Sequence, residues 1–223
     1  MSNVKQNVKE TVTDESLQDY IANEFRQRVL KFNAVCGKGL PEKVRSEDLV
    51  LQTIEQGDRV LEECVEALSA YLDNNAQERL DGLVDILVTE TQLRALIELL
   101  EQVKHENKGL VELAFSKFNP DDYVHLNEMG KLVTSSIAIA IGVNKFTPKR
   151  IKIACDLILD NNDQKWTTDL EKAKDWERNI SEEGVVLLTT EYEGVNHYSL
   201  RRLSDRKVMK PYNFVAVKLD YPH

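Results

Sequence analysis

Three carboxylates lie on an otherwise apolar helical stretch of this chain, and this pattern strongly constrains how the chain can fold. Between Leu80 and Leu100, aliphatic side chains occupy nearly every direction around a helix, which predicts a buried helix. Glu78, Asp81 and Asp85 nevertheless fall within one narrow sector of it. A carboxylate in apolar surroundings costs free energy unless it is paired or binds a metal. The pattern therefore predicts a helical bundle with a polar site inside it.

The preceding helix carries a second acidic cluster, formed by Glu62, Glu63 and Glu66. These glutamates lie opposite an aliphatic stripe at helical spacing, on the face that we expect to be solvated. The residues of this stripe are Leu61, Val65, Leu68 and Leu72. Two acidic helix faces that meet across a bundle would form a cage for a hard divalent cation.

Composition excludes some classes of function. The chain has 223 residues, of which 42% are hydrophobic and 30% charged, as in a globular helical protein. Its formal net charge of −9 disfavours nucleic-acid binding, because phosphate neutralisation needs clustered Lys and Arg. No apolar run approaches the about 18–20 residues that span a bilayer, so we expect no membrane interaction. An odd number of cysteines without C-x-x-C spacing predicts reduced thiols and a cytoplasmic location.

The order of patterns predicts a mainly α protein, a helical bundle with a small C-terminal α+β extension. Helices are expected over 14–35, 46–72, 76–104, 148–160 and 167–180, the last capped by Thr167 or Thr168. Segment 131–141 fits a helix or a strand. Strands are expected over 185–190, 195–203 and 214–219, the first two joined at 193–194. The predicted organisation is a polar lead-in over 1–13, a helical catalytic bundle over 14–110 and the extension over 111–223.

With these residues in view, the acidic clusters resemble the E-E-x-x-E … E-x-x-D pattern of the MazG-like all-α nucleoside triphosphate pyrophosphohydrolases. The glutamate of E-x-x-D would fall on Gly82, and here an acid stands one residue earlier, as Asp81. Positions three and four residues before Asp85 share a helix face, so Asp81 and Asp85 are the preferred pair. A rival register, Glu78-x-x-Asp81, fits the letters of the motif but leaves a shorter gap after Glu66.

The resemblance implies hydrolysis of a (deoxy)nucleoside triphosphate to the monophosphate and pyrophosphate. It implies Mg²⁺ as the cofactor, with Mn²⁺ as a substitute, and the expected metal ligands are Glu63, Glu66, Asp81 and Asp85. Glu62 is the candidate general base or an outer carboxylate beside the ligands. Family members pair helices between subunits, so the likeness also implies a homo-oligomer, either a dimer or a tetramer.

Three further segments resemble phage-type members of that family. Residues 32–37 read F-N-x-x-C-G and are similar to the family's F-H-x-x-F-G. Residues 124–131 read V-H-L-N-E-M-G-K and are similar to V-H-x-x-N-M-S-K. Residues 204–211 read S-D-R-K-V-M-K-P and are similar to S-D-G-K-V-L-K-P. Segment 145–180 has no counterpart. These segments supply the candidate substrate-binding residues, which are Phe32, Asn33, Lys131, Lys207 and Lys210. The phage-like tail implies a viral gene product that acts in the host cytoplasm.

An alternative from a different class stays open. The chain could be a non-enzymatic helical module that binds nucleotide or a protein partner, with the acidic residues only solvated. Neither the base nor the sugar of a substrate follows from these motifs.

Overall fold

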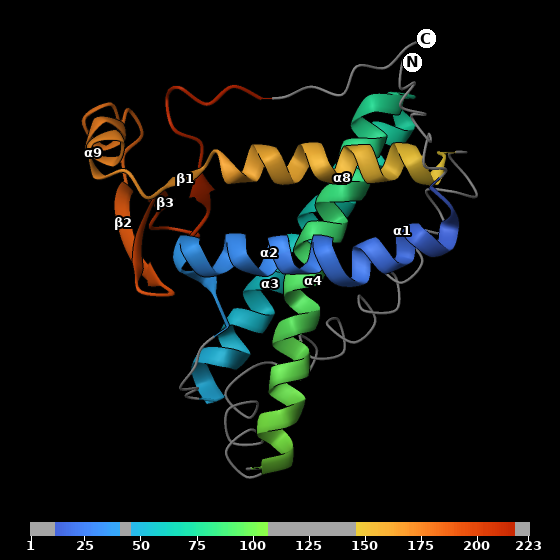
Figure 1. Cartoon of the computed structure of the whole chain (residues 1–223), viewed down its shortest axis with the longest axis horizontal. Coiled ribbons are helices and arrows are strands. Elements are labelled where there is room, and N and C mark those ends of the chain that lie inside the picture. Colours follow the sequence, from blue (N-terminus) through green and yellow to red (C-terminus); the bar gives the residue numbers. More distant parts are fainter. Residues whose placement is uncertain (1–11, 41–45, 107–145, 217–223) are drawn as a thin grey trace, which may run out of the picture.

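The computed structural model describes residues 12–40, 46–106 and 146–216. Within these ranges the protein is mainly helical and carries a small antiparallel sheet near its C-terminal end (Figure 1). The predicted mainly α class with a small C-terminal sheet is therefore confirmed.

The first helical run covers the predicted helix at 14–35. Thr13 caps it, because its hydroxyl accepts from the backbone N–H of Ser16 at 3.2 Å, and Ser16 Oγ accepts from the N–H of Thr13 at 2.8 Å. The backbone leaves the helical region at Gly37, whose φ of 69° is left-handed, and the run ends at Lys38. One stretch of π-helix interrupts the run and a second one ends it, so its elements are α1 (Asp14–Tyr20), η1 (Ile21–Phe25), α2 (Arg26–Asn33) and η2 (Ala34–Lys38).

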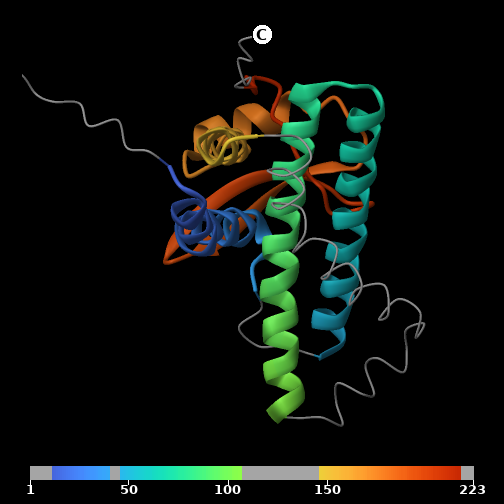
Figure 2. The ribbon, with the colours of Figure 1, turned by 90° about the vertical axis from the view of Figure 1, so that its right-hand side faces the viewer.

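Helices α3 (Ser46–Leu72) and α4 (Ala76–Glu106) form a hairpin and lie side by side along much of their length (Figure 2). The turn between them contains Asn74, whose φ of 53° is left-handed. The bounds agree with the helices predicted over 46–72 and 76–104. As expected, α4 is buried on several sides, with aliphatic side chains in three separate clusters of the core.

Helix α8 (Pro148–Asp163) lies across α4 alongside the α1–α2 run (Figure 1). Thr147 caps it, and its hydroxyl accepts from the N–H of Arg150. The largest core cluster joins α1, α4 and α8, and includes Leu17, Val84 and Leu159. This core therefore contains residues from both sides of the boundary predicted at 110.

The sheet has the order β1-β3-β2, and β4 also pairs with β3. Its strands are β1 (Trp166–Thr167), β2 (Val185–Tyr192), β3 (Val195–Arg202) and β4 (Val208–Met209), all paired antiparallel. The hairpin at Glu193 and Gly194 is confirmed, since both residues have positive φ.

Three expectations for this region were wrong. The cap of α9 (Leu170–Arg178) is Asp169, whose carboxylate accepts from the N–H groups of Glu171 and Lys172. The residues before it form β1, because Trp166 and Thr167 pair with β3 instead of joining the helix. Residues 214–216 are not a strand, and 217–219 and 131–141 lie outside the described residues.

The orientation of α3 also differs from the expectation. The aliphatic stripe is solvent-exposed, and Val65 and Leu72 reach 66% and 74% of full exposure. The face that packs on α4 instead contains smaller residues such as Ala67 and Ala70, which let the two helices approach closely. No helix within the described ranges has the length and apolar content that would let it cross a membrane.

Candidate functional site

The crossing of α3 and α4 sets the position of the acidic residues. Gly82 packs against Ala67, so closely that a β-carbon at Gly82 would lie 2.9 Å from the β-carbon of Ala67. Glu63 precedes Ala67 by one helical turn, and Asp85 follows Gly82 by about one turn. Because the two helices run in opposite directions, these turns lie at the same level of the hairpin. Glu63 and Asp85 therefore approach each other from different helices.

The charges of these acidic residues interact. Burial raises the pKa of Glu63 to about 7, with further contributions from the negative charges of Asp85 and Glu66. Burial also raises the pKa of Asp85 to about 6, and the charges of Asp81 and Glu66 act in the same direction. Each shift means that the folded protein disfavours the ionised carboxylate. A cation between α3 and α4 would relieve this cost.

Asp81 lies further along α4, next to Glu78. Burial raises the pKa of Asp81 to about 6, and the charge of Glu78 adds to the shift. Glu78 itself is exposed. Gly82 lies between Asp81 and Asp85 in the sequence, and no side chain fits there without moving the backbone of α3.

A groove of about 470 Å³ opens beside this face of α4. Asp81 and Asp85 line one wall of it, and α8 forms the opposite wall with Ile158 and Asn162. Lys165 and Lys210 also line the groove. The acidic residues of α4 thus face a cavity that contains both carboxylates and ammonium groups.

Three lysines surround the carboxylates. Lys207 Nζ lies 3.7 Å from Glu62 Oε1, and its charge lowers the pKa of Glu63. Lys210 follows β4, and Lys165 comes directly before β1; both lower the pKa of Asp85. The tail segment therefore brings its two predicted lysines to the two acidic helices, Lys207 to α3 and Lys210 to α4.

Lys165 is a site residue that sequence reasoning missed. Its Nζ donates to Asn162 Oδ1 at 2.7 Å and lies 5.8 Å from the centre of the Phe32 ring. Burial lowers its pKa, and the charge of Asp85 opposes that change. It stands at the end of α8, in a polar segment without a recognisable motif, so no local signal identifies it.

The other predicted substrate-binding residues have different surroundings. Phe32 is buried in a cluster with Val35 and Cys36, and side chains of the sheet pack against this cluster. The ammonium group of Lys165 lies over the Phe32 ring. Asn33 is also buried, and its amide donates to the carbonyl of Val29 within the same helix at 3.0 Å. Lys131 lies outside the described residues.

The side chains of Glu62 and Glu66 are exposed, whereas Glu63 and Asp85 are half-buried. Among the described residues, no group of three or more His, Cys, Asp and Glu side chains is arranged to hold a metal ion. The four-carboxylate cage therefore stays a prediction. The donor chemistry does fit Mg²⁺, which prefers oxygen ligands and binds through one or two carboxylates together with water and substrate phosphates.

Comparison of the chain with models of protein families, with curated proteins and with solved structures gives no match.

Proposed function

We propose that this protein is a Mg²⁺-dependent nucleoside triphosphate pyrophosphohydrolase of the MazG-like type. One observation carries the proposal: Glu63 and Asp85 bring interacting carboxylates from two helices to one place, with Lys165, Lys207 and Lys210 around them. Carboxylates with adjacent ammonium groups suit a ligand that contains both metal and phosphate.

In this proposal Glu63 and Asp85 would be the inner metal ligands. Glu66 and Asp81 would bind a second metal ion or a water molecule coordinated to it. When bound, Mg²⁺ neutralises phosphate oxygens and lowers the pKa of a coordinated water. The donor set fits this role because each of the four is a hard oxygen ligand.

The reaction is attack of water on the α-phosphorus. A bond forms between the water oxygen and this phosphorus, the bond to the bridging oxygen breaks, and pyrophosphate leaves. Glu62 is the proposed acceptor of the water proton, and Lys207 at 3.7 Å holds its carboxylate in place. Lys165, Lys210 and, from the sequence, Lys131 would contact the phosphate oxygens as point charges.

We place the base of the nucleotide near Phe32 and Asn33. The Phe32 ring is mostly covered, so it would contact the base only through its exposed edge. The Asn33 side-chain NH₂ group donates to its own helix, so Asn33 would contact the base only through its side-chain carbonyl oxygen.

A homo-oligomer, either a dimer or a tetramer, belongs to the same proposal. Its support is the exposed stripe on α3, where Leu61, Val65, Leu68 and Leu72 repeat every three or four residues. Such spacing is typical of helices that pair through an apolar seam. The proposed site of action is the cytoplasm, in a host cell if the gene is viral.

The test is incubation with a panel of dNTPs and NTPs, with and without Mg²⁺, followed by separation of the products. The proposal requires monophosphate and pyrophosphate to appear together, only with the metal, and to disappear in Asp85→Asn. Nucleotide binding without turnover across the whole panel would instead favour the non-enzymatic module. Release of inorganic phosphate alone would contradict cleavage between the α- and β-phosphorus atoms.

A further inference from the structure

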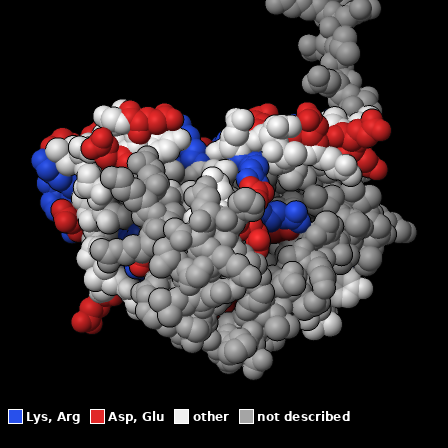
Figure 3. All heavy atoms as spheres, turned by 90° about the horizontal axis from the view of Figure 1, so that it is seen from below, with Lys and Arg blue, Asp and Glu red and all other residues white. Residues whose placement is uncertain are grey.

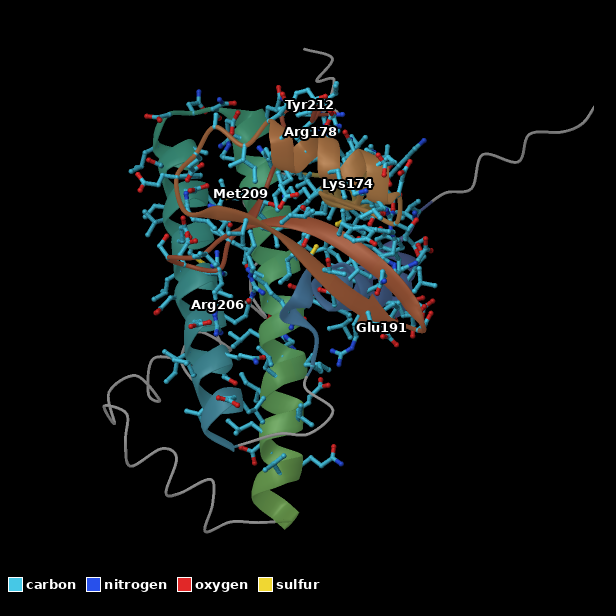
Figure 4. The ribbon with its side chains drawn as sticks, turned by 90° about the vertical axis from the view of Figure 1, so that its left-hand side faces the viewer. Lys174, Arg178, Glu191, Arg206, Met209 and Tyr212 are labelled. Carbon is cyan, nitrogen blue, oxygen red and sulfur yellow. The ribbon has the colours of Figure 1, made fainter. Side chains whose placement is uncertain are left out.

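A second cavity shares no lining residue with the groove beside α4. It has a volume of about 210 Å³, and η2, α3, α4 and the β3–β4 hairpin contribute its walls. Its lining includes one carboxylate, that of Glu55, and four cationic side chains: Lys38, Arg59, Arg201 and Arg206. Figure 4 shows Arg206 beside α3, in agreement with its 3.5 Å contact to Glu55. We call this cavity the basic cleft.

Carboxylates neutralise little of this charge. Arg206 pairs with Glu55, but the hydrogen bonds of Arg59 and Arg201 go to backbone carbonyls, those of Asp205, Gly37 and Arg206. The Asp205 carboxylate instead accepts from Arg202 at 2.6 and 3.0 Å. Among the described residues, no carboxylate oxygen lies within 4.0 Å of Lys38 Nζ. The cleft therefore has an excess of positive charge.

Elsewhere on the surface, positively and negatively charged side chains are mixed. On the described part of the face in Figure 3, Lys and Arg side chains lie next to Asp and Glu. The whole chain has a net charge of −9. A cluster of four cations around one small cavity thus differs from its surroundings, and ion pairing among the residues that the structure describes does not explain it.

Gln92 supplies an independent observation. Its side chain is buried, at 2% exposure, and lines the basic cleft. Its Nε2 donates to the carbonyl of Lys38 at 2.9 Å, whereas its Oε1 has no hydrogen-bond partner among the described residues. A buried acceptor without a donor is costly. A ligand with an O–H group as well as negative charge would satisfy both Gln92 and the cations.

We propose that the basic cleft is a binding site for a small phosphate-bearing anion, separate from the carboxylate site between α3 and α4. Guanidinium groups match the oxygens of a phosphate, and a protonated phosphate oxygen is a donor for Gln92 Oε1. The cleft is smaller than the roughly 300–1,000 Å³ of pockets for drug-sized ligands, so it suits inorganic phosphate or one phosphate group.

The environment of Lys38 agrees with this assignment. Burial lowers the pKa of Lys38 to about 7, and the charges of Arg59 and Arg201 lower it further. A bound anion would offset that repulsion. The inference does not depend on the proposed hydrolase activity, because it uses none of the acidic residues of α3 and α4.

The test is calorimetric titration of the full chain with inorganic phosphate in the presence of EDTA, so that no metal can bridge phosphate to the carboxylates. We expect one phosphate per chain and at least tenfold weaker binding in Arg59→Gln and in Arg206→Gln. Glu55→Gln should bind more tightly, because it removes the carboxylate that competes for Arg206. The matched control, Arg178→Gln on α9, should bind as the wild type does, because Arg178 pairs with Asp175 on the surface of that helix.

Sulfate tests the role of Gln92. Sulfate has no O–H group near neutral pH, so it should bind at least tenfold more weakly than phosphate, and Gln92→Met should remove that preference. Absence of phosphate binding by the wild type would overturn the proposal. Binding that Lys210→Gln abolishes and Arg59→Gln leaves intact would also overturn it, because the anion would then occupy the groove beside α4. Arg206 is exposed, so its variant tests the cleft even if Arg59→Gln fails to fold.

Discussion

Gly82 and Ala67 touch where α4 crosses α3, and a β-carbon at Gly82 would lie 3.0 Å from the backbone Cα of Ala67. This contact sets the spacing of the hairpin. It also places Glu63 and Asp85 at one level, because each lies about one turn from the crossing. The crossing thus links a packing requirement to the geometry of the candidate site.

Gly82→Ala should therefore destabilise the protein despite the better helix propensity of alanine. Overpacking of this kind costs about 1–3 kcal/mol, and the gain in propensity offsets up to about 1 kcal/mol of it. Urea unfolding followed by circular dichroism measures the net loss. In the double variant Gly82→Ala/Ala67→Gly the loss should be smaller than the sum of the two single changes. Strict additivity would show that the two residues do not press on each other.

The half-buried Glu63 predicts a pH dependence of stability in metal-free protein. Its pKa is raised from 4.5 to about 7, first by burial and then by Asp85, so the folded state holds the proton more tightly than the unfolded state. Its contribution to stability is complete below pH 4.5 and is lost as the pH rises through about 7. With EDTA present, Glu63→Gln should flatten this slope in urea titrations at pH 5, 6, 7 and 8. An unchanged slope in the variant would assign it to other groups.

The preferred register of the acidic motif predicts which alanine substitutions lower the activity most. Asp85→Ala should lower kcat/KM at least about 100-fold, because the change removes an inner ligand, without lowering the unfolding midpoint. Asp81→Ala should be nearly as damaging, and Glu78→Ala mild, since Glu78 is exposed. Steady-state assays with Mg²⁺ decide the order. A larger effect for Glu78 than for Asp85 would favour the rival register, Glu78-x-x-Asp81.

Lys165 should matter for turnover although no motif marks it. Loss of one charge-assisted contact of about 1.5–3 kcal/mol predicts that Lys165→Gln lowers kcat/KM about tenfold or more. Its removal should also raise the pKa of Asp85, since Lys165 lowers that pKa in the wild type. Lys174→Gln on α9 is the control, because Lys174 pairs with Glu171 on the surface at 2.8 Å. Equal activity of both variants would leave Lys165 with a structural role only.

The exposed stripe of α3 predicts self-association. Val65→Lys places a charge in the middle of the stripe and should shift an oligomer toward monomer in light scattering coupled to size exclusion. Val215→Lys is the control, because Val215 is 71% exposed but belongs to the segment after β4 and not to α3. A monomeric wild type at all concentrations would contradict the proposed oligomer.

Local patterns in the sequence were sufficient for the main elements. The bounds of α3 and α4, the burial of α4 and the turn at Glu193 follow from helical periodicity, strand alternation and turn residues, which act between neighbours in the chain. The same periodicity placed Asp81 and Asp85 on one face of α4.

Only the tertiary structure decided which face of α3 packs inward. This helix has two apolar faces, one with small residues such as Ala67 and one with the larger stripe around Leu68, and periodicity alone does not choose between them. Close helix packing selects the small residues, because they allow the contact at Gly82. The stripe is left exposed, and Glu63 turns toward Asp85. Lys165 joins them because α8, which it follows in the chain, packs on α4, and no local signal could predict that contact.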